Sequence, residues 1–174
     1  MYTTVMNIHT ATIPVFIKNL NNLLRLMAKG EKFAKEKKFD VSVILQTRLA
    51  PDQFNFIQQV QYMYYIALDV AVGFSGEKMP TFAYTETTME ELKISVKRVI
   101  VFLQTIRPEH LKDAEERMVP YFFNKKKLVR AETYLSQIGF PNFFFHYTLS
   151  YEILRHIGVP IGIADFTGPL PGLK

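Results

Sequence analysis

The chain has 174 residues, of which 48% are hydrophobic and 14% aromatic, so it can bury the core of one domain of ordinary size. It contains no cysteine, which excludes disulfides, thiolate metal ligands and cysteine nucleophiles. A metal site could therefore use only histidine, carboxylate or amide ligands. We predict a single domain that spans residues 1–174.

The net charge of +5 raises the question of nucleic-acid binding. The lysines, however, gather at a predicted helix end (29–38) and at a predicted turn (125–127), where cations complement the helix dipole or are simply solvated. No nucleic-acid-binding motif accompanies them. The N-terminus lacks the pattern of a secretory signal, and the apolar stretches are too short to span a membrane. We expect a cytoplasmic protein that binds neither membranes nor nucleic acid.

The first half of the chain predicts two long helices. Apolar residues recur at helical spacing over 13–36, with Pro14 in the first turn, where its missing N–H is not needed. Residues 40–49 could be a short helix or an extended connection. The sequence Ala50-Pro51-Asp52 is typical of a helix start, and the apolar pattern after it predicts a second helix to about Val72.

The second half predicts a third helix and a broken final one. Thr88 and Glu91 match a capping box at the start of an apolar stripe that ends before Pro108. Residues 117–130 predict a small hairpin or an irregular insertion. A final helix over 131–157 is expected to be interrupted at 139–141, and the tail over 159–174, which is rich in Gly and Pro, is expected to be irregular. The pattern as a whole predicts an all-α four-helix bundle with long connections.

The sequence offers few residues that could carry out catalysis, and His146 is the most informative of them. Asn142 and His146 are four residues apart, so they project from one face of the final helix within an aromatic segment. His146 could be a buried histidine that is hydrogen-bonded to a partner, or it could line a pocket and transfer protons near neutral pH. The other histidines are expected at the surface (His9 and His110) or as a helix cap (His156).

Amides and tyrosines on the second helix could complete such a pocket. Gln58 and Gln61 share a face and could orient a ligand, although neutral amides are poor metal ligands and could equally lie in solvent or bond across the bundle. Tyr65 offers an apolar ring with a polar tip, which suits a pocket or a dimer surface.

Several segments together resemble a known family; they are RLAPD (48–52), QVQ (59–61), ETT (86–88), NFFFH (142–146) and LRHIGVP (154–160). The chain is similar to an uncharacterised family of bacterial proteins within the DinB/YfiT-like superfamily of metalloenzymes. The resemblance implies a four-helix bundle that is often a homodimer. It also implies a pocket in which the wider superfamily holds a divalent metal on three histidines, one from the second helix and two from the last.

When the chain is aligned with that pattern, His146 matches the second histidine of the last helix. Asn142 stands at the position of the first, and the second-helix histidine falls near Gln58 to Gln61, where the chain has none. We therefore expect a metal-independent site for a small molecule, with His146 as the catalytic or proton-transfer group and Asn142, Gln58, Gln61 and Tyr65 around it. A non-enzymatic homodimeric interaction protein is the alternative. A divalent-metal-dependent transferase or hydrolase that recruits Asp52, Asp69 or Glu152 is a weaker one.

Overall fold

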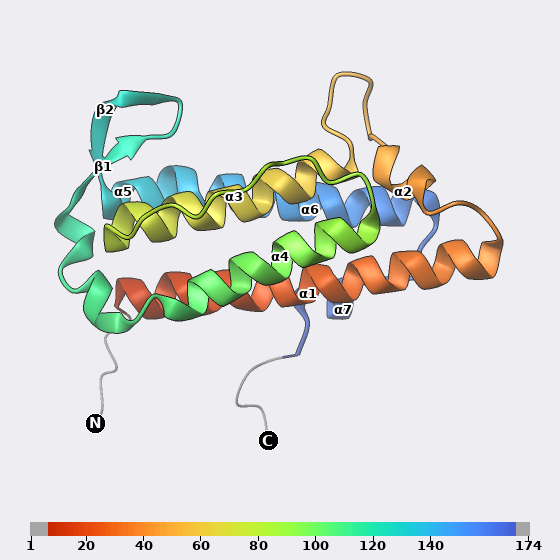
Figure 1. The fold of residues 1–174 in the computed structure, drawn as a ribbon, viewed down its shortest axis with the longest axis horizontal. Helices are drawn as coiled ribbons and strands as arrows, with labels where there is room; N and C mark the ends of the chain where they lie inside the picture. Colours follow the sequence, from red (N-terminus) through yellow and green to blue (C-terminus); the bar gives the residue numbers. More distant parts are fainter. Residues whose placement is uncertain (1–6, 170–174) are drawn as a thin grey trace.

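The computed structural model describes residues 7–169 and is mostly helical. Its long helices are α1 (Ile8–Lys37), α3 (Phe56–Ser75), α4 (Met89–Thr105) and α6 (Phe140–Ile157), which lie side by side (Figure 1). Between and after them come the short helices α2 (Ser42–Gln46), α5 (Ala131–Tyr134) and α7 (Ile163–Thr167). The 3-10 turns η1 (Pro108–Leu111) and η2 (Ala114–Glu116) and the π-turn η3 (Leu135–Gly139) complete the helical elements.

Of the two alternatives predicted for residues 117–130, a hairpin or an irregular insertion, the structure has the hairpin. Strands β1 (Met118–Tyr121) and β2 (Asn124–Arg130) pair antiparallel, with a register shift between Pro120 and Tyr121. The prediction of a helical protein with a small hairpin insertion is thus confirmed in outline, although the two-stranded sheet means that the fold is not purely all-α.

The core lies between the long helices, and α3 is the most deeply buried of them. Phe16 and Leu20 of α1, Tyr64 of α3, and Phe143 and Tyr147 of α6 are all fully buried. Helix α3 packs mainly on α6, and α1 packs mainly on α4. The buried faces repeat at helical spacing, as amphipathic helices require.

Two predicted helix starts were wrong. Helix α1 begins five residues before Ile13, because the Asn7 side chain accepts a hydrogen bond from the Thr10 backbone N–H at 2.9 Å and caps it there. Helix α3 begins at Phe56 rather than near Pro51, since Asn55 and Gln58 form the capping box. The predicted capping box of Thr88 and Glu91 is confirmed at the start of α4.

The final helix and the tail also differ from expectation. Residues 135–139 widen into a π-turn instead of breaking the chain, and Pro141, which has no N–H to donate, directly follows this turn at the beginning of α6. Gly158 ends α6 at a φ of 102°, a left-handed conformation that favours glycine. Part of the tail forms α7, and residues 170–174 lie outside the described part of the chain.

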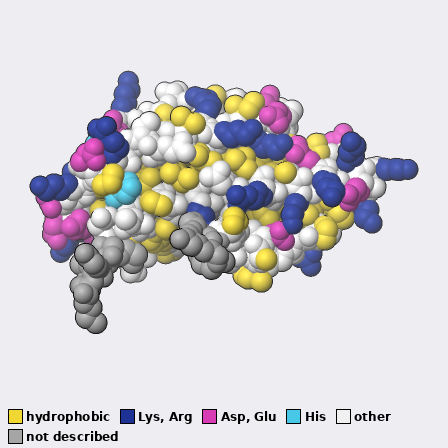
Figure 2. All heavy atoms as spheres, turned by 90° about the horizontal axis from the view of Figure 1, so that it is seen from below, with side chains coloured by type: hydrophobic (Ala, Val, Ile, Leu, Met, Phe, Trp, Pro, Cys, Tyr) yellow, Lys and Arg dark blue, Asp and Glu magenta, His cyan; other side chains and the backbone are white. Residues whose placement is uncertain are grey.

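Two features of the surface concern membranes and charge. Among the described residues, no helix is long and apolar enough to cross a membrane. On the face shown in Figure 2, Lys and Arg side chains are scattered among acidic and hydrophobic ones instead of forming one basic patch.

Two segments cover α3 and position the site described next. The connection of residues 77–88, here called the 77–88 segment, runs back along α3 before α4 begins (Figure 1). The β1–β2 hairpin projects beyond the helices, with Phe122 in its turn.

Candidate functional site

His146 lies at the packed interface between α6 and α3. Its side chain is buried, with 5% exposure, and its Nδ1 lies 2.6 Å from Oε1 of Gln59. Because an amide oxygen can only accept, Nδ1 carries the proton and donates, which leaves Nε2 unprotonated. The Ser150 hydroxyl donates to the His146 carbonyl at 2.8 Å and tightens the same turn of α6.

Aromatic rings surround this imidazole. Phe54 stacks on it at 6.2 Å and 20°, Tyr62 lies at 5.2 Å, and Phe145 meets it edge to face. Burial lowers the pKa of His146 from 6.5 to about 4. The imidazole is therefore neutral at pH 7 and a weak base.

An open cleft lies next to this closed pair, on the neighbouring side of α3. It has a volume of about 360 Å³ and is lined by Gln61, Tyr62, Tyr65, Tyr84 and Phe122, which together we call the aromatic cleft. These residues come from α3, the 77–88 segment and the hairpin turn. Tyr62 belongs to both places, because it lines the cleft and also contacts His146.

A carboxylate fixes the 77–88 segment against α3. Glu86 accepts hydrogen bonds from the Gln61 amide at 2.8 Å and from the Tyr64 hydroxyl at 3.0 Å. Burial alone would raise the pKa of Glu86, but hydrogen bonds to Ser95, Gln61 and Tyr64 outweigh it and lower that pKa. Glu86 is thus ionised at neutral pH and anchors one wall of the cleft.

Tyr84 forms the part of the cleft that lies on this segment. Its backbone is left-handed, with a φ of 54°, which is uncommon for a residue other than glycine. The ring stacks on Tyr64 at 5.7 Å and 13°, and it meets Tyr65 edge to face. The backbone strain at Tyr84 is therefore offset by the aromatic contacts that hold its ring over the cleft.

The predicted site residues fall into two groups. Gln61 and Tyr65 line the aromatic cleft, whereas His146 is packed behind Tyr62. The Gln58 side chain belongs to the capping box at the start of α3, where it accepts a hydrogen bond from the Asn55 backbone N–H at 3.1 Å. Asn142 is half-buried on α6, one turn before His146, and no partner for its amide is found in residues 7–169.

Sequence reasoning did not single out four residues that matter here. Gln59, rather than Gln58 or Gln61, faces inward and bonds to His146. Glu86, Tyr84 and Phe122 come from loops, where periodicity gives no direction for a side chain. The ETT segment at 86–88, which contributes to the family resemblance, was the one signal for Glu86.

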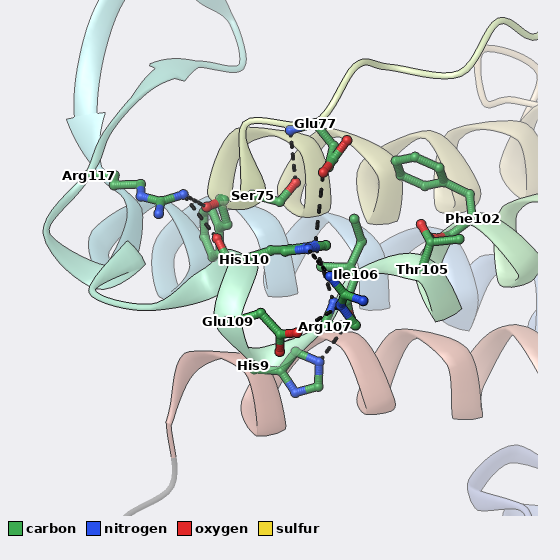
Figure 3. A network of polar contacts seen from close by, with 11 residues as sticks. His9, Ser75, Glu77, Phe102, Thr105, Ile106, Arg107, Glu109, His110 and Arg117 are labelled. Atoms are coloured by element: carbon green, nitrogen blue, oxygen red, sulfur yellow. Dashed lines mark hydrogen bonds and ion pairs between the residues drawn. The ribbon is translucent and has the colours of Figure 1, made fainter.

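The remaining histidines serve local structure, and Figure 3 shows two of them, His9 and His110. His9 lies in the first turn of α1, not before the helix, and its Nε2 is 3.1 Å from the Ile106 carbonyl. His110 accepts the Arg107 backbone N–H at 3.4 Å and faces Glu77. His156 is exposed in the last turn of α6, a position that complements the helix dipole.

The residues around His146 do not fit a divalent transition metal. The only imidazole there already bonds to an amide, and amides are weak ligands for zinc and its neighbours. Within residues 7–169, no three His, Asp or Glu side chains are grouped to hold a metal ion. Asp69 is engaged by Lys125 at 2.7 Å and by the Tyr134 hydroxyl, whereas Asp52 and Glu152 are exposed.

Comparison with solved structures defines the class of the protein as DinB-like. A crystal structure of a DinB family member protein from Shewanella denitrificans superposes with a TM-score of 0.90 at 33% sequence identity. The match covers 95% of this chain and 94% of that one. A comparison with curated proteins gave no match.

The family itself follows from the sequence match. The model of the domain of unknown function DUF1993 matches residues 8–167, so the chain belongs to that family. The resemblance inferred from the sequence motifs, to a family of unknown function within the DinB-like superfamily, is thereby confirmed.

Proposed function

We propose that this protein binds a small molecule in the aromatic cleft and does so without a metal. The observation that carries the proposal is the cleft itself, whose volume of about 360 Å³ falls at the lower end of the range for small-molecule sites. Its lining is mostly aromatic, with one amide and three phenol groups to orient a ligand.

His146 supports the cleft from behind in this proposal. It holds the Tyr62 ring in place, while its own Nδ1 is engaged by Gln59. A base with a pKa of about 4 is poorly matched to proton transfer at pH 7, where catalytic groups work best with a pKa near the ambient pH. Binding is therefore better supported than proton-transfer catalysis by His146.

The test is a ligand-observed NMR screen of small metabolites against wild type and two variants. Tyr84→Gly removes a ring from the cleft and suits the left-handed backbone at that position. Tyr121→Leu is the control, because Tyr121 lies in the hairpin but does not line the cleft. We expect hits that bind wild type and the control and lose most of their signal with Tyr84→Gly. Hits that respond equally to all three proteins, or no hits at all, would contradict the proposal.

A homodimer is a second candidate, favoured by the outer face of α4. Ile94 and Val101 are 47% and 61% exposed and, being seven residues apart, lie on the same side of the helix beside Phe102. A twofold axis would pair this row with itself. Light scattering after size exclusion should give a dimer that Val101→Glu converts to a monomer, whereas Lys127→Glu, at an exposed position of the hairpin, leaves it intact. A wild-type monomer at high micromolar concentration would argue against this candidate.

The weaker alternative, a divalent-metal-dependent enzyme, is tested by measuring the metal content of the protein. Metal analysis of the purified, tag-free protein should show no stoichiometric divalent ion in wild type or in His146→Ala. An ion present in wild type and lost in His146→Ala would replace the metal-free proposal with a metalloenzyme.

A further inference from the structure

The aromatic cleft has walls at steep angles to one another. The Tyr65 ring is inclined by 69° to Tyr84 and by 64° to Phe122, with centroid separations of 6.3 and 6.0 Å. A flat aromatic ligand is best held between two parallel rings, whereas a compact cation gains from several ring faces that surround it. The ring geometry is therefore that of a partial aromatic cage.

The polar groups of the cleft also suit a cation. Gln61 donates its amide to Glu86, so its carbonyl oxygen remains as an acceptor. The carboxylate of Glu86 is ionised directly behind this amide. No Lys or Arg is among the residues that line the cleft in the described part of the chain.

One lysine beside the cleft, Lys125, is paired with a carboxylate, and its contact with Phe122 shows that a cleft ring accepts an ammonium group. Lys125 places its Nζ 5.4 Å from the centroid of the Phe122 ring. The same Nζ lies 2.7 Å from Asp69, which balances its charge. Lys125 therefore adds little repulsion against a positively charged ligand.

From the steeply inclined rings and the Glu86 side chain hydrogen-bonded behind Gln61, we propose that the cleft selects a compact organic cation, such as a quaternary or alkylated ammonium group. This inference rests on the proposed ligand cleft and adds the chemical class of its ligand. Tyr65, Tyr84 and Phe122 supply the ring faces, and Glu86 supplies the negative potential.

The experiment compares three molecules of nearly the same shape that differ in charge: choline, the neutral 3,3-dimethylbutan-1-ol and the anionic 3,3-dimethylbutanoate. Binding is measured by calorimetry or by saturation-transfer NMR at low and high salt. We expect choline to bind about tenfold more tightly than the alcohol, since contacts with several rings and one carboxylate add up to about that factor. The anion should bind most weakly.

Variants then assign the selectivity to the cage. Tyr84→Gly and Glu86→Gln should each narrow the difference between choline and the alcohol, whereas Tyr121→Leu should preserve it. Tighter binding of the alcohol or the carboxylate would overturn the cation inference and leave the ligand cleft standing. Failure of all three molecules to bind would also overturn it, and the metabolite screen described above would then decide separately whether the cleft binds anything.

Discussion

The region around His146 and the aromatic cleft meet at Tyr62 of α3, and their polar groups differ in how many hydrogen-bond partners they have within the protein. In the closed region, His146 donates its Nδ1–H to Gln59, and the Gln59 amide donates to the Phe54 carbonyl, within the packed interface of α3 and α6. In the aromatic cleft, side chains from three separate segments surround an open volume and leave acceptor oxygens at its lining. Mutual pairing of buried polar groups stabilises the fold but uses up their capacity to bind a ligand. The open cleft, rather than the histidine, is therefore where recognition is expected.

The largest expected effect comes from breaking the closed region. His146→Ala removes a buried ring and leaves the Gln59 amide oxygen without its donor, so it should lower the free energy of unfolding by about 3–4 kcal/mol. Asn142→Ala, one turn earlier on α6, is the matched control and should cost less than about 1 kcal/mol. Urea unfolding of both variants measures the difference. Equal losses would show that the imidazole has no special structural role.

The next effect is the dependence of stability on pH. The unfolded chain binds a proton at His146 as the pH falls below 6.5, whereas the folded protein does so only near pH 4. The stabilising contribution is therefore complete above pH 6.5 and is lost as the pH falls towards 4, with a total of up to about 3 kcal/mol.

Unfolding curves at several pH values check this against His146→Gln, which keeps a hydrogen-bonding side chain without a titrating group in this range. Wild type should lose more stability than the variant between pH 6.5 and 4. Parallel pH profiles would mean that His146 is protonated as readily in the fold as in water.

A smaller loss of stability is expected when one of the hydrogen bonds that hold Glu86 against α3 is removed. Tyr64→Phe removes the hydroxyl that donates to Glu86 at 3.0 Å and should cost about 1–2 kcal/mol. Hydrogen exchange over residues 82–88 should rise, because the Gln61 bond then carries more of the attachment of Glu86 to α3. Tyr121→Phe, in the hairpin, is the control and should change neither quantity. Unchanged exchange in Tyr64→Phe would show that other contacts hold the 77–88 segment.

Sequence periodicity predicted the helical layers well and the site only in part. The apolar stripes identified the four long helices, and Thr88 with Glu91 located the start of α4, because these signals are local. The start of α3 was misplaced, since Ala50-Pro51-Asp52 carries start signals but Asn55 forms the cap. Local rules cannot choose between two such signals when tertiary contacts decide.

The site shows the same limit for a different reason. Asn142 and His146 were correctly placed on one helix face, yet the identity of the partner, Gln59, depends on how α3 is rotated against α6. Tyr84 and Phe122 reach the cleft only through the paths of the 77–88 segment and the hairpin. Loop paths of this kind carry no periodic signal from which contacts over long distances in the chain could be inferred.

The π-turn at Leu135–Gly139 sets the angular phase of the chain that leads into α6. A π-turn contains more residues than an α-turn, and one residue corresponds to about 100° of rotation around a helix axis. By taking up one extra residue, the π-turn lets the helices on its two sides both keep their buried faces towards the core: Ala131 and Tyr134 before it and Phe143 and Tyr147 after it are all buried. A regular α-helix through the same residues would turn one of these faces away from the core. The wider turn thereby keeps α5, and the hairpin joined to it, on the side where Phe122 meets Tyr65.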